Sequence, residues 1–213
     1  MDEAFNRPIR LGVLISGGGT TLDNLLCEIR EQRLAAEVVT VVADRDCAGI
    51  DKARAAGMEC SLIAGRSFAS VADFSTALFD HLREWRVDLV VLAGFLARID
   101  IPEDFVNRVM NIHPALIPSF CGRGMHGRHV HAAVIERGCT ISGCTVHFCD
   151  NEYDHGPIIL QQCVPVADDD TPESLAARVF EAECFAYPEA IRRYAAGRLR
   201  IEGSRVRTLS ERL

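Results

Sequence analysis

The chain has 213 residues, of which 48% are apolar and 25% charged, and its formal net charge is −7. This length allows one domain with a substantial core. We therefore expect a single domain over residues 1–213, with loose tails at 1–8 and 204–213. The acidic balance argues against a nucleic-acid partner, because such proteins usually present basic surfaces. The longest apolar runs fall short of the ~20 residues that a membrane-spanning helix needs, so no membrane partner is expected.

The cysteine pattern is typical of a reducing compartment. The chain has nine cysteines, an odd number, and they form no CxxC pair. The polar start of the sequence lacks the apolar region of a signal peptide. We expect a cytoplasmic protein with reduced thiols.

The first half alternates short apolar runs with amphipathic segments. Strands are predicted at 9–15, 38–43, 60–63 and 88–93, and helices with apolar residues at helical spacing at 20–34, 48–56 and 68–85. The run at 88–93 is apolar on both faces, which is typical of a central parallel strand. This repetition predicts an α/β fold with a doubly wound, mostly parallel sheet.

The second half of the sequence predicts a different order of strands and helices. It contains a short strand at 110–112, a helix at 130–137, and two strands at 143–149 and 158–165 that a polar turn would join as an antiparallel pair. A long helix at 171–195 follows, with Pro172 at its first position, and then a last strand at 199–202. The C-terminal portion of the sheet is therefore expected to be antiparallel.

A glycine-rich turn, Ser16-Gly17-Gly18-Gly19-Thr20-Thr21, follows the first strand and opens the first helix. Backbone N–H groups at a helix N-terminus can hold a phosphate without a lysine, and glycine permits close approach. The motif is neither a Walker A loop nor a complete GxGxxG. A tight strand-to-helix turn with Thr20 as the N-cap explains it equally well.

Asn111 and His113 alternate along a predicted strand, so their side chains point to the same side. They stand at the end of an apolar run, where open α/β sheets place ligands. An amide and an imidazole together suit acyl-type transfer, because they can hold a developing oxyanion and move protons. The alternative is a hydrogen-bonded histidine at a strand end.

An acidic turn at 150–157 lies between the two predicted antiparallel strands. A carboxylate from this turn placed near His113 would favour the imidazolium, raise its pKa and accept a proton from an amine. The alternative is a solvated hairpin loop. Neither the cluster of His126, His129 and His131 nor the regularly spaced cysteines has the spacing of a metal site, so no metal is expected.

Taken together, the motifs resemble the phosphoribosylglycinamide formyltransferase family. The resemblance runs from about residue 10 to 203 and rests on the glycine turn and on segments at 92–95, 111–118, 146–148, 154–159 and 187–188. It implies a Rossmann-like formyltransferase fold. It also implies transfer of the formyl group of 10-formyltetrahydrofolate, as co-substrate, to the amine of glycinamide ribonucleotide in purine synthesis.

The resemblance also implies a role for individual residues. The catalytic set would be Asn111, His113 and Asp154, supported by Thr145 and His147. The substrate phosphate would bind at Gly19, Thr20 and Thr21, and the ribose or glycinamide at Glu183. The folate would contact the residues Leu96, Ala97, Arg98, Ile99, Asn111, Asp150, Asn151, Glu152, Tyr153 and Asp154.

Two other functions share these features. A formyltetrahydrofolate deformylase would use the same three residues to deliver the formyl group to water, and a nucleotide-binding module would bind without turnover. The partners expected are the two small-molecule substrates, with the protein a monomer or a homodimer.

Overall fold

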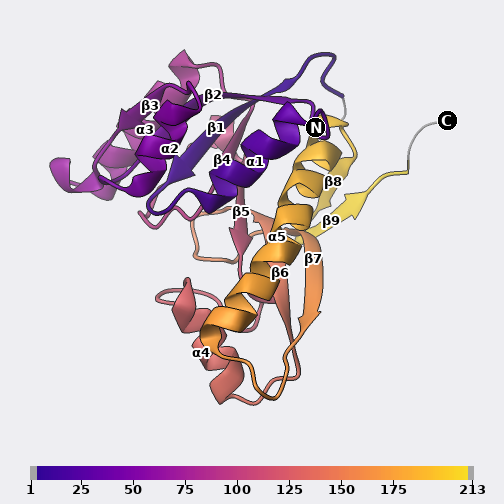
Figure 1. The fold of residues 1–213 in the computed structure, drawn as a ribbon. Helices are drawn as coiled ribbons and strands as arrows, with labels where there is room; N and C mark the ends of the chain where they lie inside the picture. Colours follow the sequence, from indigo (N-terminus) through magenta and orange to yellow (C-terminus); the bar gives the residue numbers. More distant parts are fainter. Residues whose placement is uncertain (1–3, 211–213) are drawn as a thin grey trace. The chain divides into compact units, whose positions relative to one another are not determined.

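The computed structural model describes residues 4–210, which divide into two compact units at 5–110 and from 111 onward. The N-terminal unit alternates strands and helices along the chain (Figure 1): β1 (Ile9–Ile15), α1 (Thr20–Arg30), β2 (Ala36–Ala43), α2 (Ala48–Ala55), β3 (Cys60–Leu62), α3 (Val71–Glu84) and β4 (Leu89–Leu92). Short 3₁₀ turns occur at Gly65–Ser67 and Glu103–Phe105. The strand order is β3-β2-β1-β4, and the neighbouring strands are parallel.

Burial on both faces explains why these strands lack a polar alternation. Leu11, Val13 and Val91 are all fully buried, as expected for parallel strands covered by helices. The apolar stripes of the helices complete the core, with Leu22 and Leu25 on α1 and Leu78 on α3.

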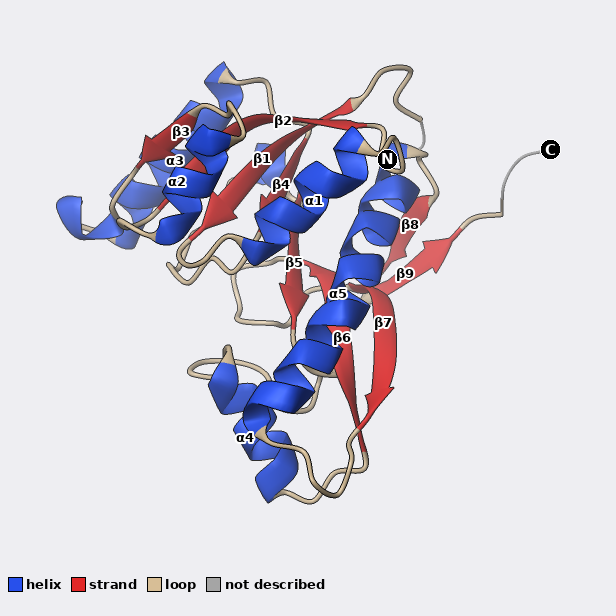
Figure 2. Cartoon of the chain, in the orientation of Figure 1, coloured by secondary structure: helices blue, strands red, loops and turns tan. Residues whose placement is uncertain are grey.

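The strand β5 (Val109–His113) begins in the N-terminal unit and ends in the C-terminal one. The C-terminal unit continues with α4 (Arg128–Glu136), β6 (Ile141–Phe148), β7 (Ile158–Pro165), α5 (Pro172–Ala195), β8 (Leu199–Glu202) and β9 (Arg205–Thr208). Its strand order is β5-β6-β7-β9-β8. The pairs β6–β7 and β8–β9 are antiparallel, and α5 packs along β6 and β7 (Figure 2).

The predicted fold class is confirmed, with parallel strands in the first half and antiparallel pairs in the second. The helix predicted from residue 68 begins later, at Val71, because the Ser70 side chain accepts a hydrogen bond from the Asp73 N–H and caps it. The segment after residue 203, expected to be a loose tail, contains the strand β9 in the structure. Gly203 takes a φ of 61°, and the turn there returns the chain as β9 beside β8.

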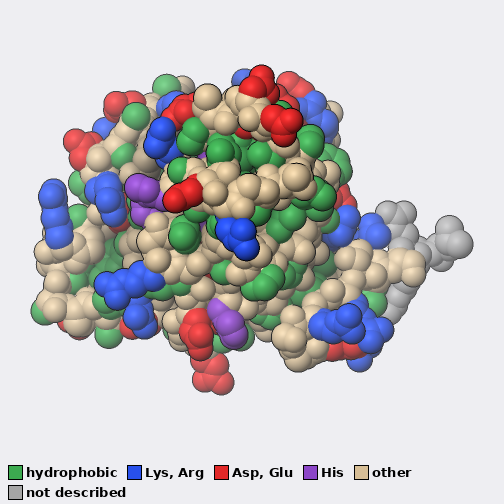
Figure 3. All heavy atoms as spheres, turned by 90° about the horizontal axis from the view of Figure 1, so that it is seen from below, with side chains coloured by type: hydrophobic (Ala, Val, Ile, Leu, Met, Phe, Trp, Pro, Cys, Tyr) green, Lys and Arg blue, Asp and Glu red, His purple; other side chains and the backbone are tan. Residues whose placement is uncertain are grey.

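The surface drawn in Figure 3 mixes acidic, basic and apolar side chains rather than gathering one charge. Among residues 4–210, no helix is long and apolar enough to cross a membrane.

Candidate active site

The end of β5 carries two of the predicted catalytic side chains. Asn111 and His113 are two positions apart on the strand, so both point to the same side of it. His113 is 3% exposed, whereas Asn111 is half-buried. Burial at a strand end keeps the imidazole in one orientation and leaves the amide accessible.

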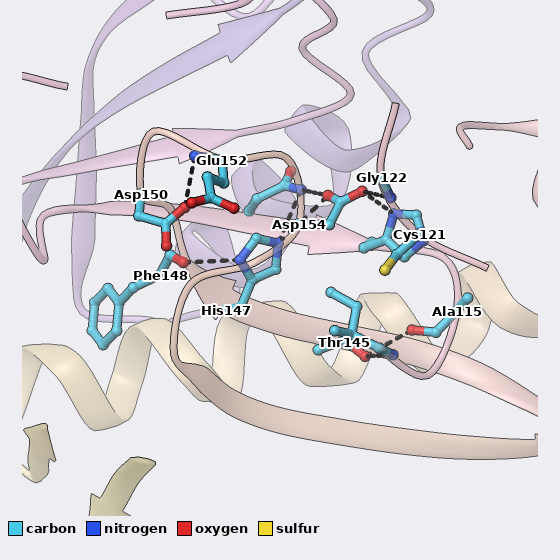
Figure 4. Close-up of polar contacts among 12 residues, drawn as sticks. Ala115, Cys121, Gly122, Thr145, His147, Phe148, Asp150, Glu152 and Asp154 are labelled. Carbon is cyan, nitrogen blue, oxygen red and sulfur yellow. Dashed lines mark hydrogen bonds and ion pairs between the residues drawn. The ribbon is translucent and has the colours of Figure 1, made fainter. Parts of the chain in front are cut away.

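The loop between β6 and β7 supplies the third predicted residue. Asp154 has a φ of 53°, in the left-handed region that aspartate tolerates better than most residues. One carboxylate oxygen, Oδ2, accepts a hydrogen bond from the Gly122 N–H at 2.8 Å and lies 3.5 Å from His113 Nδ1. The other, Oδ1, lies 3.5 Å from Asn111 Nδ2. The three predicted residues therefore come together in the C-terminal unit. Figure 4 shows Asp154 beside the Gly122 backbone.

A backbone contact fixes the protonation pattern of His113. Its Nε2 lies 2.8 Å from the Phe120 carbonyl oxygen. A carbonyl can only accept, so Nε2 must carry the hydrogen and donate it. In the neutral ring, Nδ1 then holds the lone pair, and Nδ1 is the nitrogen that faces Asp154.

The pKa of His113 differs from the sequence-based expectation. We expected the carboxylate to raise it. Burial of the ring is the larger effect and lowers the pKa below its ordinary value, while Asp154 and the Phe120 carbonyl offset only part of that shift. Removing a cation from water outweighs one nearby negative charge at this site. His113 is therefore neutral around pH 7 before substrates bind.

Asp154 stays ionised in the same surroundings. Burial acts to raise its pKa, but the nearby His147 and His113 and the hydrogen bond from the Gly122 N–H together outweigh burial and hold the pKa low. The site thus pairs a carboxylate with a neutral imidazole. The imidazole can accept a proton, and the carboxylate would stabilise the imidazolium that forms.

His147, on β6, orients the amide of Asn111. Its Nδ1 lies 2.9 Å from the Phe148 carbonyl oxygen and must donate to it. With the hydrogen on Nδ1, Nε2 is left as the acceptor for Asn111 Nδ2, 3.3 Å away. The amide nitrogen of Asn111 is thereby placed between His147 and Asp154, which makes His147 a positioning residue.

Thr145 supports the backbone that follows His113 rather than the reactive groups. Its hydroxyl donates to the Ala115 carbonyl at 2.7 Å and accepts from the Ile117 N–H at 3.0 Å. Gln161 Nε2 donates to the same hydroxyl and to the Ile117 carbonyl. Sequence reasoning missed Gln161, Phe120 and Gly122; the last two act through backbone atoms, which leave no residue-type signal.

The rest of the predicted folate loop is ordered around Asp150. Its carboxylate accepts from the Glu152 N–H at 2.9 Å and pairs with His155 Nδ1 at 2.7 Å, and this pairing raises the pKa of His155. Tyr153 is exposed. Hydrogen bonds within the loop therefore hold its backbone, and its aromatic side chain is exposed. Asn151 lies in the same turn.

The other predicted folate residues, Leu96, Ala97, Arg98 and Ile99, lie in the N-terminal unit after β4. The Leu96 N–H donates to the Ser16 hydroxyl at 2.8 Å. This bond ties the predicted folate segment to the glycine turn within one unit.

The glycine turn presents open donors. Gly19, not Thr20, is the N-cap of α1; its φ is 72°, and it has no side chain to cap the helix. Thr20, Thr21 and Leu22 form the first turn of α1, so their N–H groups have no acceptor within the helix. Three donors at the positive end of a helix are suited to bind an anion.

Glu183 lies on α5 in the C-terminal unit and is half-buried. Burial raises its pKa to about 7. The carboxyl is therefore a proton donor as well as an acceptor near neutral pH, which suits hydroxyl groups as partners.

The three histidines that follow β5 are not grouped as one site. The rings of His126 and His129 meet edge to face, with centroids 5.7 Å apart, whereas His131 is buried in the core of its unit. No cluster of potential metal ligands occurs in the part of the chain that the structure describes.

Comparisons with known proteins identify the family. The model described as "Formyl transferase" matches residues 9–191. A phosphoribosylglycinamide formyltransferase from Haemophilus influenzae is 32% identical over 196 residues, covering 91% of this chain and 90% of that protein. The chain belongs to the phosphoribosylglycinamide formyltransferase family.

Solved structures agree with this membership in the phosphoribosylglycinamide formyltransferase family. The glycinamide ribonucleotide transformylase 1 of Symbiobacterium toebii is 43% identical, with a TM-score of 0.90, covering 97% of this chain and 96% of that one. A formyltetrahydrofolate deformylase from Pseudomonas syringae has a TM-score of 0.85 but 19% identity, so it shares the fold.

Some relatives in the family are much longer. The trifunctional purine biosynthetic protein adenosine-3 of Bos taurus is 38% identical over 206 residues, which are 95% of this chain but 20% of that protein. This chain therefore spans about a fifth of that relative's length.

Proposed function

We propose that this protein transfers the formyl group of 10-formyltetrahydrofolate to the amine of glycinamide ribonucleotide, a step of purine synthesis. The observation that carries the proposal is the convergence of Asn111, His113 and Asp154 within one unit, with His113 Nδ1 facing the carboxylate at 3.5 Å. The choice of substrates is supported by family membership, because two of the similar proteins are named phosphoribosylglycinamide formyltransferase and glycinamide ribonucleotide transformylase.

The first step is attack of the ribonucleotide amine on the formyl carbon. A C–N bond forms while the carbonyl π electrons move to oxygen. Neutral His113 accepts the amine proton at Nδ1, either directly or through a water, because Nε2 is already engaged by the Phe120 carbonyl. The imidazolium that results is stabilised by the ionised Asp154.

The oxyanion needs donors at the same moment. The Asn111 amide is held by His147 and supplies an N–H, and the new imidazolium supplies a second donor. When the intermediate collapses, the bond from carbon to folate nitrogen breaks. The imidazolium then returns its proton to that nitrogen, so one proton moves from amine to leaving group and His113 ends neutral.

The binding assignments follow from the same proposal. Gly19, Thr20 and Thr21 bind the ribonucleotide phosphate through the open N–H groups of α1, and Glu183 contacts the ribose or glycinamide. The proposed folate contacts are, in the N-terminal unit, the segment at 96–99 and, in the C-terminal unit, Asn111 and the loop at 150–154. The chemistry proposed here uses side chains alone, without a metal.

We place the protein in the cytoplasm as part of this proposal. All nine cysteines, from Cys27 to Cys184, are free thiols, which fits a reducing compartment. Gel filtration with light scattering distinguishes the monomer from the homodimer that we also expect.

Tetrahydrofolate release tests the proposed function directly. Purified protein is mixed with 10-formyltetrahydrofolate, with and without glycinamide ribonucleotide, and absorbance is followed. Release that depends on the ribonucleotide supports the transferase. Release without it identifies a deformylase, and no release in either mixture leaves a nucleotide-binding module.

A further inference from the structure

The basic residues of the chain are almost all arginines. The chain has 23 lysine and arginine residues, and Lys52 is the only lysine among them. A lysine ammonium is a compact point charge with three donors on a flexible stem, whereas arginine presents a planar fork. The location of the single lysine is therefore informative.

Lys52 lies on α2, which packs against the glycine turn of the same unit. The Gly49 N–H donates to the Gly17 carbonyl at 3.0 Å. A Cβ added at Gly19 would meet Gly49 Cα at 2.9 Å and Lys52 Cδ at 3.5 Å. The absence of a side chain at Gly19 thus lets α2 approach the start of α1 and brings the lysine stem beside it.

The Lys52 ammonium forms an exposed ion pair with Asp23, which it can exchange for another anion. Its Nζ lies 2.5 Å from Oδ2 of Asp23, and the two side chains are 37% and 49% exposed. Exposed ion pairs of this kind contribute little to stability. Asp23 is in the first turn of α1, next to the open N–H groups of Thr20, Thr21 and Leu22.

We propose that Lys52 is the cationic arm of the phosphate subsite at the glycine turn, exchanging Asp23 for the phosphate monoester when the ribonucleotide binds. This inference rests on the proposed function, which places the phosphate at Gly19–Thr21. The backbone amides contribute neutral donors, and the lysine contributes the charge that distinguishes a phosphate dianion from an uncharged group. Asp23 holds the lysine beside the turn until the phosphate arrives.

The two partners of the ion pair give opposite predictions. Lys52→Met weakens ribonucleotide binding by roughly 10- to 100-fold in calorimetry, the usual effect of losing a charge-assisted hydrogen bond. Asp23→Asn strengthens binding, because it removes the competing carboxylate. If the pair were only structural, both variants would break the same contact and change affinity in the same direction, which would overturn the proposal.

Two controls isolate the phosphate. Arg54→Met removes an exposed positive charge from the same helix and leaves affinity for the ribonucleotide unchanged. Glycinamide riboside, which lacks the phosphate, binds Lys52→Met and the unmodified protein equally well. A loss of riboside binding in Lys52→Met would mean that the lysine acts elsewhere.

Chemical labelling gives a readout that does not depend on activity. With one lysine in the chain, an N-hydroxysuccinimide ester modifies Lys52 and the α-amine, which serves as internal reference. Ribonucleotide or inorganic phosphate slows modification of Lys52 but not of the α-amine. Ribonucleotide that binds and turns over without protecting Lys52 contradicts the lysine assignment alone, whereas absence of ribonucleotide binding and turnover contradicts the proposed function itself.

Discussion

At the scale of single residues, the protonation of His113 is set by burial acting against a carboxylate. The ring is 3% exposed, and burial lowers its pKa more than Asp154 raises it. In the proposed mechanism, the imidazole therefore starts the reaction neutral and becomes charged only when the amine gives up its proton. This order would favour catalysis, because the positive charge of the donor would develop together with the oxyanion.

Asp154→Asn tests this balance. Without the carboxylate, nothing offsets burial to the same extent, so the pKa of His113 falls further. NMR titration of the imidazole should show the midpoint moving to lower pH than in the unmodified protein. A midpoint that moves to higher pH would contradict the assignment of Asp154 as the group that raises it. Turnover should also fall, because the imidazolium loses its counter-charge.

We propose that His147 acts through Asn111, which it contacts, and a double-mutant cycle tests this role. Asn111→Ala should lower kcat by about 10²–10³, the usual effect of losing one oxyanion donor. His147→Ala should lower kcat by less, since the amide is still present but no longer held. The double variant should be no slower than Asn111→Ala, because the contact that His147 serves is gone. Additive losses would assign His147 an independent role.

At the scale of elements, the loop that carries Asp154 is anchored at the base of the β6–β7 hairpin. A Cβ added at Gly156 would overlap the Phe148 carbonyl oxygen, and that strand must also keep its carbonyl in place for His147. Glycine is required at this point by the close approach of two backbones, not by its turn-forming tendency.

Gly156→Ala should therefore destabilise the protein and slow turnover together. Forcing a methyl group into backbone contact costs on the order of 1–3 kcal/mol, measured from urea unfolding midpoints. The control is Gly65→Ala, where the nearest atoms, in the Phe74 ring, lie 3.8 Å away. Equal stability of the two variants would show that the hairpin base relaxes freely.

At the scale of the whole molecule, three buried or half-buried histidines couple stability to pH. Burial lowers the pKa of His81, His113 and His131 in the folded protein. The unfolded chain, with histidine pKa values near ~6.5, binds protons first as the pH falls. The contribution of these three histidines to stability is therefore complete above about pH 6.5 and is lost as the pH drops through their lower folded pKa values.

Urea unfolding between pH 7.5 and 5 checks this dependence, and the midpoint should fall toward the acidic end. His131→Leu should make the slope shallower, because one buried titrating group with an unpartnered Nδ1 is removed. His129→Leu, at an exposed position of the same helix, should leave the slope unchanged. Identical slopes in His131→Leu and the unmodified protein would mean that His131 titrates normally in the folded state.

The sequence alone determined the order and class of the elements, because apolar periodicity records which face of a segment is buried. It also singled out Asn111 and His113, since their alternation on one strand follows from local geometry. The strand β9 was missed, because whether a polar tail pairs with β8 depends on the turn at Gly203 rather than on apolar pattern.

Only the tertiary structure decided the chemistry of the site. The sign of the pKa shift at His113 depends on how deeply the ring is buried, and its tautomer depends on the Phe120 carbonyl. The placement of Lys52 beside Gly19 depends on the packing of α2 against the start of α1. Burial, backbone acceptors and contacts between distant segments are properties of the folded chain, and no residue type encodes them by itself.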